Sequence, residues 1–122
     1  MDCSPMIDIA ISLAAAIPYE RHKKRLCAIL LDKRNRLVSV GYNSYDKTER
    51  KMYEYGKRAG NPCKIFPHAE VAALIKDKAK RGVRLIVARV DAEGKPALAK
   101  PCESCMLAIK DHGKIKSIEF TV

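Results

Sequence analysis

Hydrophobic positions in the first third of the chain predict one helix followed by a pair of strands. Ser4 and Pro5 are typical of a helix start, because proline fits the first helical position. Apolar residues then recur on one broad helical face, at positions 6, 7, 9, 10, 13, 14 and 17, and Pro18 ends the pattern. Two short apolar runs follow, residues 26–32 and 37–41, with a polar turn between them. Together these runs predict a β-hairpin.

A long polar stretch separates this hairpin from the second half of the chain. Residues 46–62 are rich in charge and contain Gly56, Gly60 and Pro62, which favour a loop. The part around residues 50–58 also fits a helix. Because long loops inside compact domains tend to be functional, we expect this stretch to contribute to binding.

The second half alternates helical and strand patterns. Residues from 68 onward are rich in helix formers, with Gly82 as the expected C-cap. Residues 84–90 are almost continuously apolar, which is typical of a central strand.

A further helix and strand complete the pattern. Residues 102–111 have an apolar helical face and are closed by Gly113, and residues 115–122 read as a last strand. The order helix, two strands, loop, helix, strand, helix, strand predicts an α/β fold, with a mixed sheet of about four to five strands flanked by helices.

Length and composition predict a single globular domain, residues 1–122. The chain has 122 residues, of which 48% are hydrophobic and 31% charged, which argues against disorder, collagen and coiled coil. Its longest apolar stretches, residues 9–17 and 27–31, are much shorter than a membrane span. The first residues carry no basic region of the kind that opens a secretion signal.

The charge is strongly basic. Lys and Arg number 24 against 14 Asp and Glu, a formal net charge of +10. This excess suits nucleic acid, a phosphorylated small substrate or an acidic partner, and also a basic protein whose lysines are merely solvated. The basic residues are spread along the chain, and without Trp no broad stacking platform for single strands is evident.

Cysteine usage indicates a reducing compartment. The five cysteines lie at positions 3, 27, 63, 102 and 105, and the odd count with one close pair argues against a disulfide framework. We therefore expect a cytoplasmic protein in which the close pair serves metal or redox chemistry.

That pair, Cys102 and Cys105, is a candidate for metal binding. The i, i+3 spacing puts both thiols on one helix face, near a positive N-terminus that favours thiolates. A redox pair, or two cysteines facing the core, would show the same spacing. His68 also lies at an expected helix start, so one imidazole and two thiolates could bind Zn²⁺ and leave a fourth position open for water.

Glu70 gives this constellation a catalytic meaning. It lies two residues past His68, where a carboxylate can exchange protons with a water whose pKa zinc lowers to about 7. An acid in the first turn of a helix is common by itself, because it interacts favourably with the helix dipole. Only the combination with the cysteine motif favours the catalytic interpretation.

Two motifs together resemble the zinc deaminases of the cytidine, deoxycytidylate and tRNA-adenosine type: His-Ala-Glu at residues 68–70 and Pro-Cys-Glu-Ser-Cys at residues 101–105. The resemblance covers most of the chain and implies a three-layer cytidine-deaminase-like fold. It implies that His68, Cys102 and Cys105 bind one zinc ion and that Glu70 moves protons. The reaction implied is attack of activated water on C4 of cytosine or C6 of adenine, with loss of ammonia.

The resemblance also suggests substrate contacts. Asn43, in Gly-Tyr-Asn at residues 41–43, matches the Asn that follows the second strand in the family, although a turn Asn is a plain alternative. Ala69 lies inside the first motif and Phe66 just before it, and we expect both at the substrate. Core packing would explain Phe66 equally well.

The sequence departs from the family pattern at two points. It ends at Val122, where family members commonly continue through another helix and strand, so we expect self-association to cover an open sheet edge. Cys63 lies five positions before His68, and with the three expected ligands it would form a closed, structural Cys3His site.

Three functions remain open from the sequence. The first is a deaminase of a free cytosine nucleoside or nucleotide (dCMP, CMP or cytidine), with basic residues of the long loop holding a phosphate. The second, favoured by the charge, is an editing deaminase on cytosine or adenine in single-stranded DNA or RNA. The third is a zinc-stabilised nucleic-acid-binding module without activity. We favour the first, as a homo-oligomer with a small-molecule substrate and no membrane partner.

Overall fold

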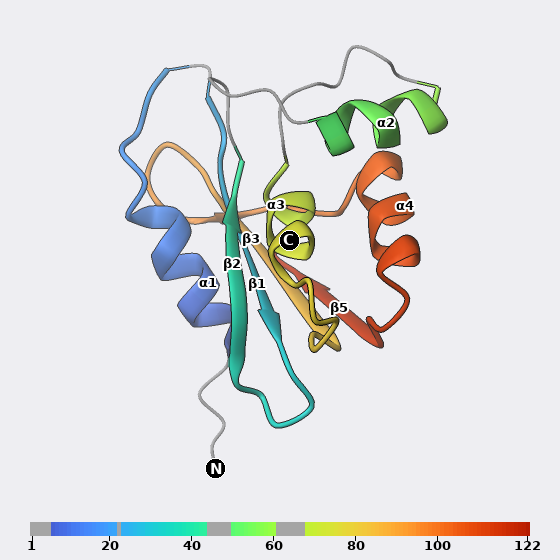
Figure 1. The fold of residues 1–122 in the computed structure, drawn as a ribbon. Coiled ribbons are helices and arrows are strands. Elements are labelled where there is room, and N and C mark those ends of the chain that lie inside the picture. The colour runs from blue at the N-terminus through green and yellow to red at the C-terminus, as the bar shows by residue number, and fades with distance from the viewer. Residues whose placement is uncertain (1–5, 22, 44–49, 61–67) are drawn as a thin grey trace.

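The fold is built on one mixed sheet, seen edge-on in Figure 1. A computed structural model describes residues 6–21, 23–43, 50–60 and 68–122. The sheet contains β1 (Arg25–Leu31), β2 (Leu37–Tyr42), β3 (Arg84–Val90), β4 (Pro96–Ala97) and β5 (Ser117–Phe120). Strands β2, β1, β3 and β4 are neighbours in that order and pair antiparallel, and β5 pairs parallel to β3. The predicted α/β fold with a mixed sheet is confirmed.

Helices cover both faces of this sheet and produce three layers. One face carries α1 (Met6–Ala15), and the other carries α3 (Ala69–Lys76) and α4 (Glu103–His112). The charged helix α2 (Arg50–Arg58) lies against α4 at the periphery (Figure 1). The helical interpretation of the long polar stretch is therefore confirmed over residues 50–58.

The central strands β1 and β3 are mostly apolar, because both of their faces are buried. Since side chains alternate along a strand, β1 and β3 each supply residues to two separate cores. The core under α3 and α4 includes Ala28, Leu30, Leu85 and Val87. The core under α1 includes Cys27, Ile29, Leu31, Ile86 and Ala88.

The helix ends agree with the sequence in one case and differ in another. Gly113 closes α4 in the left-handed conformation at φ 81°, as predicted. Gly82 does not close α3, which ends at Lys76 with Asp77 as its C-cap. Gly82 is needed for a packing reason, because a Cβ there would lie 2.3 Å from Cγ of Leu30.

None of the helices among the described residues combines the length and apolarity needed to cross a membrane.

Candidate active site

Two helix N-termini meet over the sheet and bring three potential metal ligands together. His68 is the N-cap of α3 and Cys102 the N-cap of α4, both with extended backbone. An N-cap side chain usually accepts a hydrogen bond from its own helix, but neither of these does so. Their side chains therefore face the space between the two helices, where Cys105 of the first turn of α4 also lies.

The separations of the three ligand atoms suit one zinc ion. Nδ1 of His68 lies 3.3 Å from Sγ of Cys105 and 3.5 Å from Sγ of Cys102, and the two sulfurs are 3.6 Å apart. Tetrahedral zinc, with bonds of about 2.3 Å to sulfur and about 2.0 Å to nitrogen, separates two sulfurs by about 3.8 Å and nitrogen from sulfur by about 3.5 Å. The donor atoms and their spacing therefore fit zinc. The predicted zinc cofactor is confirmed in the sense that this group of residues could hold one ion.

The two thiols differ in acidity because they share a hydrogen bond. The pKa of Cys102 is lowered to about 2, chiefly by its hydrogen bond with Cys105 and also by its contact with His68. The same hydrogen bond, together with burial, raises the pKa of Cys105. Because cysteine binds zinc as the thiolate, metal binding would release any thiol proton that remains on this pair.

Glu70 lies in the first turn of α3 and is almost completely buried, at 3% exposure. Burial is the main cause of its raised pKa, and the charge of His68 acts in the opposite direction. Its Oε1 atom has no hydrogen-bond partner among the described residues. A buried carboxylate with a free oxygen is costly unless something in the site uses it, so this atom is suited to holding and passing a proton.

Two strand residues that the sequence analysis did not single out determine where α3 lies. A Cβ on Gly41 would lie 2.3 Å from the backbone oxygen of Ala69 and 2.4 Å from the nitrogen of Ala73, so only glycine permits this contact between β2 and α3. The buried Ser39 hydroxyl donates to the carbonyl oxygen of Ala73 over 2.8 Å. A glycine inside a strand is itself a signal of close backbone approach, and it points to Gly41.

A buried pair ties the other ends of α3 and α4 together. Nε2 of His112 lies 2.8 Å from Oδ2 of Asp77, and both side chains are 1% exposed. The backbone N–H of Lys114 donates to Nδ1 of His112, so Nε2 carries the ring proton and donates to Asp77. These residues are far apart in the chain, and no sequence pattern pairs them.

The structure places the predicted substrate residues as follows. Oδ1 of Asn43 accepts from the backbone N–H of Leu26, and its Nδ2 donates to the carbonyl oxygen of Lys24, so its amide joins the end of β2 to the start of β1. Ala69 is fully buried. Phe66 and Cys63 lie outside the described residues. Substrate contact by Asn43, Ala69 and Phe66 stays a prediction.

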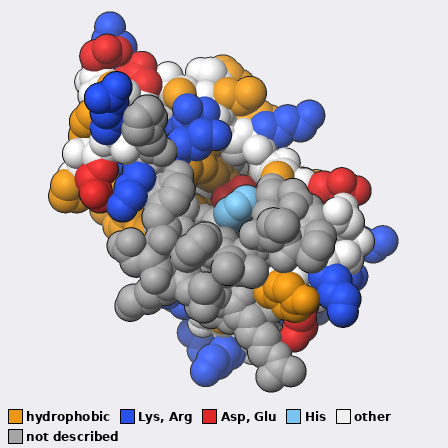
Figure 2. Space-filling view, turned by 90° about the horizontal axis from the view of Figure 1, so that it is seen from above, with side chains coloured by type: hydrophobic (Ala, Val, Ile, Leu, Met, Phe, Trp, Pro, Cys, Tyr) orange, Lys and Arg blue, Asp and Glu red, His pale blue; other side chains and the backbone are white. Residues whose placement is uncertain are grey.

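The end of the molecule that carries the helix N-termini presents basic side chains near the ligand cluster (Figure 2). Figure 2 shows a histidine side chain at this surface, with an acidic side chain next to it and a group of basic side chains nearby. A positive field there would attract an anionic substrate.

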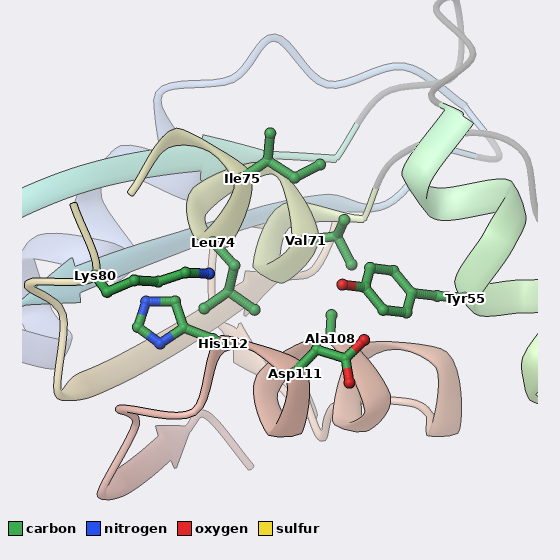
Figure 3. A pocket seen from close by; sticks show the side chains of 8 residues that line it. All are labelled: Tyr55, Val71, Leu74, Ile75, Lys80, Ala108, Asp111 and His112. Atoms are coloured by element: carbon green, nitrogen blue, oxygen red, sulfur yellow. The ribbon is translucent and has the colours of Figure 1, made fainter. Parts of the chain in front are cut away.

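A separate hollow of about 210 Å³ lies between α2, α3 and α4 (Figure 3). Its lining includes Tyr55, Leu74, Asp111 and His112. None of the three ligand residues nor Glu70 lines it, so it is not the site of the chemistry described above.

Comparison with known proteins agrees with this geometry. The family model described as "Cytidine and deoxycytidylate deaminase zinc-binding region" matches residues 3–122. The cytidine deaminase of Mycobacterium tuberculosis is 25% identical, with 93% of this chain and 80% of that chain covered and a TM-score of 0.54. The cytidine deaminase of Burkholderia pseudomallei shares the fold at 15% identity, with 96% and 83% covered and a TM-score of 0.61. No match was found among curated protein sequences.

Proposed function

The chain belongs to the cytidine and deoxycytidylate deaminase family, and from that premise we propose that it hydrolyses the amino group of cytosine in a nucleoside or nucleotide. As a member of this family it is a zinc-dependent hydrolytic deaminase. The proposed substrate is cytidine, CMP, dCMP or a close analogue, and the products are the corresponding uracil compound and ammonia.

The juxtaposition of the ligand cluster with the buried Glu70 carboxylate carries the proposal. His68, Cys102 and Cys105 supply three ligands, which leaves a fourth position for water, as in catalytic zinc sites. A fully closed structural site would have no use for an unpartnered carboxylate oxygen beside it. The family membership also decides against the third possibility, a binding module without activity.

Bound zinc supplies the Lewis acidity that makes water a nucleophile at neutral pH. Glu70 would accept one proton of the attacking water and deliver it to the ring nitrogen N3, and would then take the second proton from the new hydroxyl on C4 and deliver it to the departing amine. Over the reaction a C–O bond forms at C4, the C4–N bond breaks, and one water is consumed for each ammonia released. The burial of Glu70 serves this role, because its raised pKa makes the protonated form accessible during the cycle.

A nucleic-acid substrate is the alternative, and the net charge of +10 supports it. Neutralising phosphates with Lys and Arg gives affinity for any polynucleotide, and that affinity falls steeply with salt. The target base would still have to enter the same site unpaired.

A panel assay tests the proposal and separates the alternatives. The zinc-loaded protein is incubated with nucleosides, nucleotides and single-stranded oligonucleotides that contain cytosine or adenine, and products are detected by a mass increase of about 1 Da and by released ammonia. Turnover of free cytosine nucleosides or nucleotides supports the proposal. Turnover of oligonucleotides alone, suppressed by salt, supports the alternative, and turnover of adenine substrates alone contradicts the proposed base.

We also infer self-association through the sheet edge. Strand β2 pairs only with β1 among the described strands, and it exposes Leu37 (57%) and Tyr42 (41%). Apolar side chains on an open edge favour pairing with a second copy. Light scattering after gel filtration should give a mass above the 13.6 kDa of one chain.

A further inference from the structure

Arg89 lies at the end of β3 on the same sheet face as the ligand cluster. Leu85 and Val87 of this strand are in the core that includes Ala69 and Cys105. Because strand side chains alternate, Arg89 points to that face as well, two residues beyond Val87.

The strand register places Arg89 just past the start of α3. Val87 pairs with Ala28, and Ala28 with Gly41, the residue on which the first turn of α3 lies. Two residues further toward the helix N-termini, on the same face of the sheet, Leu26 pairs with Arg89. Leu26 also packs against the same core. Arg89 therefore lies on the face of the sheet that α3 covers, beside the N-terminal end of α3, where His68 and Glu70 are.

Arg89 also contacts the segment that leads into the cysteine motif. Its backbone N–H donates to the hydroxyl of Thr121, and its Nη1 reaches the carbonyl oxygen of Leu98 over 3.4 Å. The following residue, Ala99, is buried in the core under α4. These contacts hold the strand end, but they leave the Nε atom of the guanidinium without an acceptor among the described residues.

The guanidinium of Arg89 has an unsatisfied donor. Its Nε is buried and has no partner among the described residues, and no carboxylate in that part of the chain pairs with it. Other arginines do have such partners: Arg36 pairs with Asp32, Arg58 with Asp111 and Arg84 with Glu119. A buried charged donor without an acceptor is unfavourable, which indicates that a ligand supplies the acceptor.

We propose that Arg89 binds the phosphate of the substrate and makes the enzyme prefer phosphorylated cytosine substrates over nucleosides. The inference rests on the proposed function and deepens it. A phosphate suits this position because its oxygens match the fork of guanidinium donors, and because a dianion balances the unpaired positive charge. Asn43, which follows β2 on the other side of β1, cannot play this part as it stands, because its amide is bonded to the backbone at Lys24 and Leu26.

The test compares kcat/KM for dCMP and deoxycytidine in the wild type, in Arg89→Met and in Arg89→Lys. The ratio of the two values should fall about 10- to 100-fold in Arg89→Met, the effect of losing a charge-assisted hydrogen bond. Arg89→Lys keeps the positive charge but not the paired guanidinium donors, so its ratio should lie between those of the wild type and Arg89→Met. Deamination of an oligodeoxynucleotide with a single cytosine is measured in parallel. If kcat/KM for the oligodeoxynucleotide also falls in Arg89→Met, the phosphate that Arg89 contacts can be a phosphodiester.

Arg36→Met is the matched control, because it removes the same charge at a side chain 68% exposed in the β1–β2 turn. It should keep the wild-type ratio. An unchanged ratio in Arg89→Met, or an equal fall in Arg36→Met, overturns the inference.

Product binding separates this inference from the proposed function. The zinc-loaded wild type should bind dUMP more tightly than deoxyuridine, and Arg89→Met should lose the difference while keeping its zinc and its thermal unfolding transition. A wild type that binds dUMP selectively but deaminates nothing contradicts the proposed function alone. A wild type that binds both products equally contradicts the role of Arg89.

Discussion

Glu70 shows how one side chain acquires a role from its surroundings. An exposed first-turn glutamate would only interact with the helix dipole. Here the carboxylate is buried beside two thiols and an imidazole, and one of its oxygens has no partner among the described residues. Burial raises the pKa of Glu70, which favours its taking up and releasing a proton during the reaction.

Replacing Glu70 should separate catalysis from metal binding. Glu70→Gln should reduce kcat by about 10²- to 10⁴-fold, because the amide cannot exchange a proton. Zinc content should stay at one ion per chain, because the ligands are unchanged. The exposed Glu93→Gln is the control and should retain full activity. Undiminished turnover in Glu70→Gln would show that another group moves the proton.

Cys63 decides between an open and a closed metal site. We expect Cys63→Ser to keep about one zinc per chain by metal analysis, because three protein ligands are enough for a catalytic site. Cys102→Ser should lose most of its zinc, since it removes one of the clustered ligands. If both variants lose the metal equally, the site is structural.

At the scale of elements, the site depends on how closely α3 lies on β2 and on how its ends are joined to α4. Gly41 and Ser39 fix the first of these contacts. The ligand cluster joins the two helix beginnings, and Asp77 with His112 joins the helix ends. Each helix is thus held at both ends.

Gly41→Ala should displace α3. The new Cβ would meet backbone atoms at 2.3 and 2.4 Å, which cannot move without moving the helix. Overpacking of this kind costs about 2–3 kcal/mol of unfolding free energy, and kcat should fall because Glu70 moves with α3. Gly94→Ala is the comparison, since no atom lies within 4 Å and only its φ of 80° is unfavourable. It should cost about 1 kcal/mol and leave kcat unchanged. Equal losses of kcat in the two variants would contradict this account.

The Asp77–His112 pair should make stability depend on pH. Although burial alone would raise the pKa of Asp77, hydrogen bonds from the N–H groups of Arg81 and Gly82 and from His112 lower it. The stability that ionised Asp77 contributes is therefore complete above its unfolded pKa of about 3.9 and is lost as pH falls through the lower folded value.

Urea unfolding of the wild type and Asp77→Asn between neutral pH and about pH 3 checks this expectation. The wild type should be more stable by about 2 kcal/mol at neutral pH, and the difference should shrink below about pH 4. A difference that stays constant with pH would mean that Asp77 is not ionised in the folded protein.

Elements with strong local signals could be predicted from the sequence, and contacts between distant segments could not. The strand at residues 84–90 is apolar at most positions because both of its faces are buried, and Gly113 ends a helix by its own conformation. Gly82 was wrongly assigned as a cap, because a glycine that makes room for Leu30 looks the same in the sequence. The roles of His112 and Arg89 could not be predicted from the sequence, because they depend on residues that are distant in the chain and close only in the fold.

At the scale of the whole molecule, zinc would connect the two helices that cover one face of the sheet. The ligands come from residues 68 and 102–105, so the metal closes a long loop of the chain. Zinc binds this arrangement in preference to the unfolded chain and therefore stabilises the fold by linkage.

Chelation should lower the melting temperature without unfolding the protein at room temperature. At free zinc about 100-fold above the dissociation constant, the metal adds about 2.7 kcal/mol of stability, which chelation removes. Calorimetry with and without chelator measures the shift, and circular dichroism should show unchanged helix content at 25 °C. Complete loss of helix on chelation would show that the metal is required for folding.

The pair that joins the far ends of the helices has a practical consequence for spectroscopy. Asp77 and His112 hold α3 and α4 side by side without help from the metal. The metal-free protein should therefore stay folded and bind Co²⁺ at neutral pH. Because zinc is colourless and Co²⁺ absorbs visible light, the absorption spectrum would then report the binding of inhibitors or products at the metal.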